Sequence, residues 1–292
     1  LHHLTITGQL ERALGEGGDQ RLPVPESIQE VLRQRLLRLP RGTQELLTLG
    51  AVIGPTFGVD LVADVAGEPV DDVLDVLEDV VRSGIVSEVG VDTFAFVHAI
   101  VRNALLAELS ASRLARAHRR VAEALEARGA EQFDELARHW QMAGAESNAT
   151  KYIAKAAERD MVALAYESAK ARYQQVIDLL QRDANADLAQ RARAAIGLAA
   201  ATRSLGEASF RDLVARAGRL ARAARSPELM AEAASLSYWV SFYVAELPDE
   251  EMIELCEDAL ELLPDTHPMR VRLLVALSLH LTFTPDQQQR EK

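Results

Sequence analysis

The chain has 292 residues, of which 48% are hydrophobic, 26% are charged and only 5% are aromatic. This is ordinary globular composition, and the length predicts two domains or one domain followed by a repeat array. The single cysteine, Cys256, excludes an intrachain disulfide and a cysteine-rich metal cluster, as is typical of a reducing compartment. No apolar run approaches the roughly 20 residues that cross a bilayer, and no secretion signal is recognisable, so we expect a cytoplasmic protein.

Acidic charge is concentrated in the first 110 residues. They hold eight arginines, no lysine and 17 acidic residues, a net charge of −9 out of −12 for the chain. Binding to DNA needs lysines and arginines that neutralise phosphates. We therefore expect no direct DNA binding by this part of the chain.

The first 110 residues predict helices that are followed by a β-hairpin. Helical periodicity covers residues 25–40, 43–53, 59–66 and 70–82, and the last of these carries apolar residues on one face and five acidic residues on the other. The period then changes to that of strands over residues 85–89 and 94–97, with a turn over 90–93, before a helix over 98–109. Helices followed by a small hairpin describe a winged helix.

From residue 111 onward the sequence predicts helices only. The expected spans are 111–128, 131–143, 147–163, 166–181, 186–204, 209–224, 227–245, 249–263 and 267–282, separated by short breaks that carry glycine or proline. These lengths suit antiparallel helix pairs.

A weak internal repeat runs through these helices. One 4-and-3 spacing of apolar residues recurs after 40 and then 42 residues, in the sets Tyr173, Ile177, Leu180; Leu213, Ala217, Leu220; and Leu255, Ala259, Leu262. A period near 40 predicts helix-pair repeats that stack into an α-solenoid of tetratricopeptide-like type. Small residues at Ala169, Ala217 and Ala259 would let neighbouring helices approach closely. The alternative is an irregular helical bundle.

The search for catalytic chemistry returns negatives. No glycine-rich phosphate loop is present, and none of the four lysines follows a glycine, so the segment cannot hold a nucleotide unaided. No two histidines have the i, i+4 spacing of a zinc-binding helix. We expect no catalytic site and no metal site, and hence no enzyme in this segment.

Aromatic residues supply one candidate for partner binding. Tyr238, Trp239 and Tyr243 lie in the densest aromatic patch of the chain, and one or two of them could line a groove. The alternative is that they pack against a neighbouring repeat. Trp140 and Cys256 are expected in the core.

Four runs carry a resemblance to a known family: residues 22–40, Ala51-Val52-Ile53-Gly54-Pro55-Thr56-Phe57, residues 94–105, and residues 116–125. Together they resemble the region behind the nucleotide-binding core of bacterial signal-transduction ATPases with numerous domains (STAND ATPases). That family includes MalT-like and LuxR-type regulators and cyclase-linked ATPases. The resemblance covers residues 20–180 well and the remainder only as generic repeats.

The resemblance implies an organisation and a function. Residues 1–24 would be the tail of the ATPase core and lid, 25–110 the winged helix, and 111–292 a tetratricopeptide-like sensor for an inducer or protein partner. Leu1 is not a methionine, and the last residues follow a helix-like run without a closing feature, so we expect a segment of a longer polypeptide. ATP or ADP would be bound by the upstream core, and the parent would be an ATPase that regulates transcription. The alternative function is a free-standing repeat adaptor with no link to nucleotide.

The resemblance also singles out His98. Phe94-Ala95-Phe96-Val97-His98 resembles the family's Phe-x-Phe-x-His motif, whose histidine lies near the nucleotide phosphates in the closed, ADP-bound state. An imidazole N–H can donate to a phosphate oxygen, which would make the position of the winged helix depend on the nucleotide. Ala99 stands where the related plant and animal motif has aspartate, so the match is partial. The alternative is that His98 braces a strand-to-helix corner.

Overall fold

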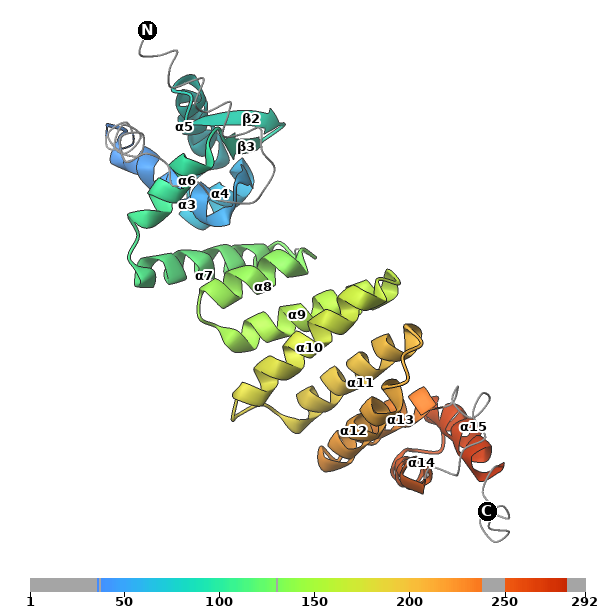
Figure 1. Ribbon diagram of the computed structural model, residues 1–292. Coiled ribbons are helices and arrows are strands. Elements are labelled where there is room, and N and C mark those ends of the chain that lie inside the picture. The colour runs from blue at the N-terminus through green and yellow to red at the C-terminus, as the bar shows by residue number, and fades with distance from the viewer. Residues whose placement is uncertain (1–35, 37, 130, 238–249, 283–292) are drawn as a thin grey trace, which may run out of the picture. The chain divides into compact units, whose positions relative to one another are not determined.

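The computed structural model describes residues 36, 38–129, 131–237 and 250–282 (Figure 1). It confirms a mainly helical protein with one small antiparallel sheet. The chain divides into two compact units between Arg113 and Leu114. The predicted helix over residues 25–40 lies almost entirely outside the described residues. Within the described stretches, no helix combines the length and the apolarity needed to span a membrane.

The first unit alternates helices with three short strands. Their order is α3 (Arg41–Ile53), β1 (Thr56–Gly58), α4 (Val59–Ala66), α5 (Val70–Arg82), β2 (Val86–Gly90), β3 (Thr93–Phe96) and α6 (Ala99–Ala107). The sheet order is β1-β3-β2 with both pairs antiparallel, and a bulge between Glu88 and Gly90 bends the hairpin. The helices predicted over residues 43–53, 59–66, 70–82 and 98–109 and the hairpin are present, whereas β1 was not predicted as a strand.

The core of the first unit forms where α3, α4 and α5 meet the sheet. Phe57 and Phe94 are almost fully buried, and their ring centroids lie 6.3 Å apart across the β1–β3 pair. Helix α5 buries Val73, Leu77 and Val80 and leaves its five acidic residues exposed. This split follows the spacing of the apolar residues, because positions three and four apart share one helix face.

The second unit contains helices throughout its described residues. They are α7 (Ala111–Ala127), which begins just before the unit boundary, α8 (Phe133–Met142), α9 (Glu146–Val162), α10 (Tyr166–Arg182), α11 (Leu188–Ser204), α12 (Phe210–Ala223), α13 (Pro227–Ser237), α14 (Glu250–Leu262) and α15 (Met269–Thr282). From α8 onward, each helix packs against the next, and α9, α11, α13 and α15 also contact one another in sequence (Figure 1). These contacts are those of hairpins that stack in chain order.

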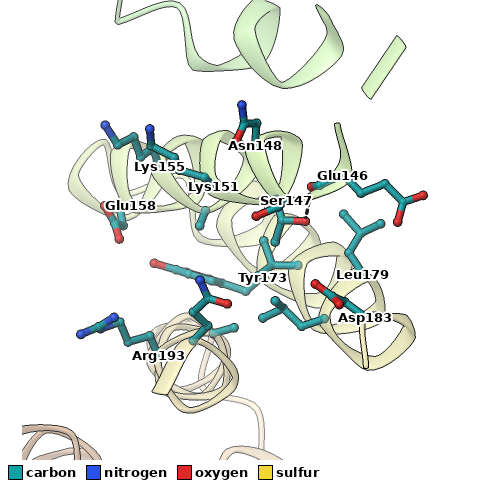
Figure 2. Close-up of a pocket in the computed structure, with 16 residues that line it drawn as sticks. Glu146, Ser147, Asn148, Lys151, Lys155, Glu158, Tyr173, Leu179, Asp183 and Arg193 are labelled. Carbon is teal, nitrogen blue, oxygen red and sulfur yellow. Dashed lines mark hydrogen bonds between the residues drawn. The ribbon is translucent and has the colours of Figure 1, made fainter. Parts of the chain in front are cut away.

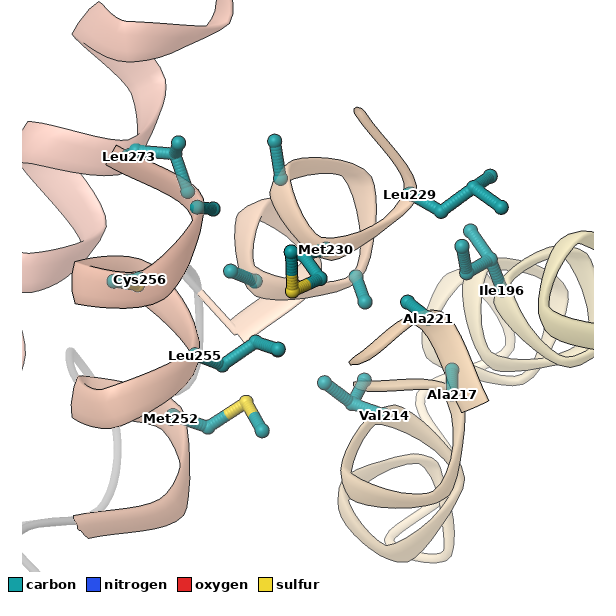
Figure 3. Packing of buried hydrophobic residues seen from close by; sticks show 14 of the residues in the cluster. Ile196, Val214, Ala217, Ala221, Leu229, Met230, Met252, Leu255, Cys256 and Leu273 are labelled. Atoms are coloured by element: carbon teal, nitrogen blue, oxygen red, sulfur yellow. The ribbon is translucent and has the colours of Figure 1, made fainter. Parts of the chain in front are cut away.

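Small residues set the spacing of the stacked helices. Ala169, Ala217 and Ala259 are fully buried, as predicted from the repeat, whereas Leu262 of the same pattern is exposed. Figure 3 shows the core of the last hairpins, in which Met230 and Leu255 lie between α12, α13 and α14. Cys256 is buried in this core, as expected.

Two polar clusters tie α7, α8, α9 and α10 together. The Glu126 carboxylate accepts hydrogen bonds from Trp140 Nε1 at 3.2 Å and from the Tyr152 hydroxyl, so one side chain of α7 bonds to α8 and α9. The other cluster centres on Asp160, which is 6% exposed. Its carboxylate accepts from Arg172 Nε at 2.7 Å, from Arg159 Nη2 at 2.8 Å and from the Ser168 hydroxyl.

The Asp160 cluster makes the free energy of unfolding depend on pH in the acidic range. Burial opposes ionisation of Asp160, but the hydrogen bonds from Ser168, Arg159 and Arg172 outweigh it and lower the pKa to about 2. A carboxyl whose folded pKa is lowered stabilises the fold above its unfolded value, and that contribution is lost as the pH falls from 3.8 toward 2.

We therefore predict that Asp160→Asn lowers the free energy of unfolding by roughly 2 kcal/mol at pH 7 and by much less at pH 2. Urea denaturation at both pH values measures the difference. Asp178→Asn, at an exposed position on α10, is the control and should change stability by less than about 0.5 kcal/mol. An Asp160→Asn deficit of equal size at pH 7 and pH 2 would contradict the assigned role.

Candidate functional site

The structure places His98 at the start of α6, directly after β3. His98 has extended backbone angles (φ −134°, ψ 132°), and its side chain makes no capping hydrogen bond. Its carbonyl instead accepts from the Val101 N–H at 3.0 Å. The imidazole is exposed. The first turn of a helix carries free N–H groups that favour anions, so the position suits a phosphate.

Tyr238, Trp239 and Tyr243, the aromatic residues predicted to bind a partner, lie outside the described residues. Trp140 is buried, as predicted, and its indole N–H is satisfied by Glu126. No group of three or more histidine, cysteine or acidic side chains within the described ranges could hold a metal ion.

Two histidines that are 21 residues apart meet in the second unit. His118 of α7 and His139 of α8 are buried, and their Nδ1 atoms lie 2.8 Å apart. Arg138 Nη2 lies 2.8 Å from Nε2 of His139. Because a guanidinium can only donate, Nε2 of His139 accepts and its Nδ1–H donates to His118. The pair is therefore a hydrogen-bonded contact between α7 and α8 that the sequence spacing did not reveal.

A pocket of about 400 Å³ lies where α9, α10 and α11 meet (Figure 2). Its apolar wall comes from one helix face each of α9, α10 and α11, and comprises Ala154, Val176, Leu179, Leu180 and Ala194. Its polar rim includes Glu158 near one end and Glu146 and Asp183 near the other (Figure 2). All of these residues belong to the second unit.

The Tyr173 ring lies in this pocket against a glycine of α11. An added Cβ on Gly197 would lie 2.3 Å from two ring carbons of Tyr173, so only glycine leaves room for the ring. Tyr173 is 7% exposed and is one of the residues that line the cavity. Burial, and then the negative charge of Glu158, raise the pKa of Tyr173 to about 12. Among the described residues, no group hydrogen-bonds to its hydroxyl.

The two lysines of the pocket direct their ammonium groups elsewhere. Lys151 Nζ lies 4.9 Å from the ring centroid of Tyr152, and Lys155 Nζ lies 5.6 Å from that of Phe133. Figure 2 shows both amines turned away from Tyr173, whereas Glu158 and Arg193 lie on either side of its hydroxyl. The pocket is also lined by four uncharged polar residues, Ser147, Asn148, Thr150 and Gln190.

Sequence reasoning did not predict this pocket. The sequence pattern identified Tyr173 only as an apolar repeat position. It assigned no role to Gly197, which lies in an alanine-rich helix. The available signal was that pair: a tyrosine at a repeat position and a glycine in the interior of the next helix, where glycine is otherwise unfavourable.

Comparison of the chain with protein-family models, with curated proteins and with solved structures finds no match. The resemblance of residues 20–180 to the STAND ATPases therefore stays a prediction.

The contact between Tyr173 and Gly197 yields a sharp prediction. Gly197→Ala should lower the free energy of unfolding by about 1–3 kcal/mol, because the new methyl group overpacks the ring. In a Tyr173→Leu background the same substitution should cost little or should stabilise, since alanine favours helix over glycine by up to about 1 kcal/mol.

A double-mutant cycle by urea denaturation measures this coupling. Gly42→Ala is the matched control, because a Cβ there has no neighbour within 4 Å. An equal cost of Gly197→Ala in both backgrounds would show that the ring does not impose the constraint.

Proposed function

We propose that this chain is the regulatory and sensor segment of a multidomain, nucleotide-dependent signalling protein of the STAND type. In this proposal the first unit is a winged helix that acts as a clamp for the nucleotide state. The second unit is a tetratricopeptide-like solenoid that senses an inducer or a protein partner. Nucleotide is bound by the protein's own upstream ATPase core, and the segment itself catalyses nothing.

The element order of the first unit supports the winged-helix assignment. A helix and a short strand precede two helices and a hairpin, and β1 pairs with the second strand of that hairpin. The hairpin β2–β3 would be the wing. Val91 near its tip is 88% exposed and Val89 is 58% exposed. Apolar side chains at these positions suit contact with another protein surface better than contact with a phosphate backbone.

The exposed acidic face of α5 is the single observation that carries the proposal. In a DNA-binding winged helix, this helix would approach the duplex. Here Asp71, Asp72, Asp75, Glu78 and Asp79 are all exposed and would be repelled by phosphates. A winged helix that cannot read DNA needs another role, and a protein-facing clamp fits both the acidic helix and the apolar wing.

His98 would link this clamp to the nucleotide. Its imidazole is exposed, makes no capping hydrogen bond and lies at the N-terminus of α6. These features leave a ring N–H available to donate to a phosphate of ADP bound in the upstream core. They favour the sensor role of His98 over that of a corner brace.

The second candidate function is a repeat adaptor that never meets a nucleotide. The pocket favours it in one respect, because all of the residues that line it come from the second unit. The encoded sequence that precedes Leu1 separates the two candidates: a phosphate-binding loop within the preceding few hundred residues supports the signalling role. If the whole gene encodes no phosphate-binding loop, the repeat adaptor is the function that remains.

In a polypeptide that includes the upstream core, we predict that His98→Ala speeds ADP release about tenfold or more, as expected for a lost hydrogen bond to a charged group. The loss would bias the protein toward its active state. Stopped-flow measurement of ADP dissociation, with a melting curve of the same variant, gives the result. Asn103→Ala, at an exposed position on α6, should leave both unchanged. A lower melting temperature with an unchanged ADP rate would show that His98 only braces the corner.

A further inference from the structure

Three polar groups from three helices converge at one end of the pocket. They are the carboxylate of Glu158 on α9, the hydroxyl of Tyr173 on α10 and the guanidinium of Arg193 on α11 (Figure 2). No ion pair within the described residues joins Glu158 or Arg193 to another side chain. Both residues are exposed, and the positive charge of Arg193 also acts on the Glu232 carboxylate. The hydroxyl belongs to a tyrosine that is 7% exposed, and it has no hydrogen-bond partner among those residues. The hydroxyl is accessible from the cavity, so a ligand there can hydrogen-bond to it.

The chemistry of the three groups defines the ligand's head. A carboxylate accepts hydrogen bonds and attracts a cation, whereas a guanidinium donates two parallel hydrogen bonds and attracts an anion. A phenol can serve both. The complementary group therefore carries a cation and an anion a short distance apart, as the ammonium and carboxylate of an α-amino acid do.

The walls of the pocket define the rest of the ligand. The apolar part of the lining includes Ala154, Val176, Leu180 and Ala194. A cavity of about 400 Å³ has room for an amino-acid side chain beside the head group. Glu146 lies twelve residues before Glu158 on α9, about 18 Å along the helix axis. The acidic far end is thus too distant to bind the head, and it disfavours an acidic side chain.

We infer that this pocket binds a free α-amino acid with an aliphatic or aromatic side chain. The carboxylate lies on Arg193, the ammonium on Glu158 and the Tyr173 hydroxyl between them. A phosphorylated ligand does not fit, because both lysine ammonium groups of the pocket lie over aromatic rings and three carboxylates remain on its rim. This inference rests on the proposed sensor function, for which it names the class of inducer.

The test is isothermal titration calorimetry of the chain with L-leucine and L-phenylalanine. L-leucinamide lacks the carboxylate and 4-methylpentanoate lacks the ammonium, so each should bind at least about tenfold more weakly than L-leucine. Arg193→Gln and Glu158→Gln should each weaken L-leucine by about tenfold or more. Tyr173→Phe keeps the ring on Gly197 and should weaken binding about threefold or more.

Arg182→Gln and Glu167→Gln are the matched controls on α10, because both residues are exposed and neither lines the pocket. They should bind L-leucine as the parent chain does. Absence of heat with both amino acids up to about 10 mM overturns the inference. Binding of either truncated analogue as tightly as L-leucine, unchanged affinity in the Arg193 and Glu158 variants, or binding of apolar peptides alone would do the same.

The outcome is distinguishable from failure of the proposed function. L-leucine binding in a protein whose gene encodes no phosphate loop would uphold the pocket and remove the nucleotide switch. A faster ADP release by His98→Ala without any amino-acid binding would uphold the switch and remove this inducer.

Discussion

The close approach of α10 to α11 is the constraint on which the second unit depends. The Tyr173 ring can pack against α11 only because Gly197 has no side chain. A glycine also leaves room for a neighbouring side chain between α12 and α14, where a Cβ on Gly218 would lie 2.7 Å from Leu255 Cδ2. Stacked helices bury their apolar faces only in contact with neighbours, so small residues at the contacts determine how the array packs. The pocket follows from this packing, because the ring that fills the gap also directs its hydroxyl into the cavity.

The two units distribute their charged side chains differently. The first unit separates its apolar and acidic residues onto opposite faces of α5, which leaves a surface that repels polyanions. The second unit neutralises many of its charges internally, as in the cluster of Asp160, Arg159 and Arg172. Glu158 and Arg193 make no such ion pair within the described residues, although both flank a buried phenol. Both charges are exposed and line the pocket.

Much of the fold could be predicted from the sequence, because its signals are local. The spans of α4 and α5 were predicted at the residues where the structure has them, since apolar spacing and flanking glycine or proline fix helix ends. Strand β1 was missed because three residues carry no periodicity and its partner Phe94 lies 37 positions away from Phe57. The pocket and the pair of His118 with His139 were missed for the same reason: each depends on contacts between different helices. For His98 the sequence supplied the position, and the structure adds its exposure.

If the pocket receives the inducer, its occupancy and the nucleotide state of the parent protein are coupled. Reciprocal linkage makes this measurable as the dissociation rate of ADP from a polypeptide that joins this chain to its upstream core, with and without saturating L-leucine. We predict that L-leucine changes the ADP dissociation rate several-fold in the parent protein and not in its Arg193→Gln variant. An ADP rate that stays the same while calorimetry shows the pocket filled would contradict it.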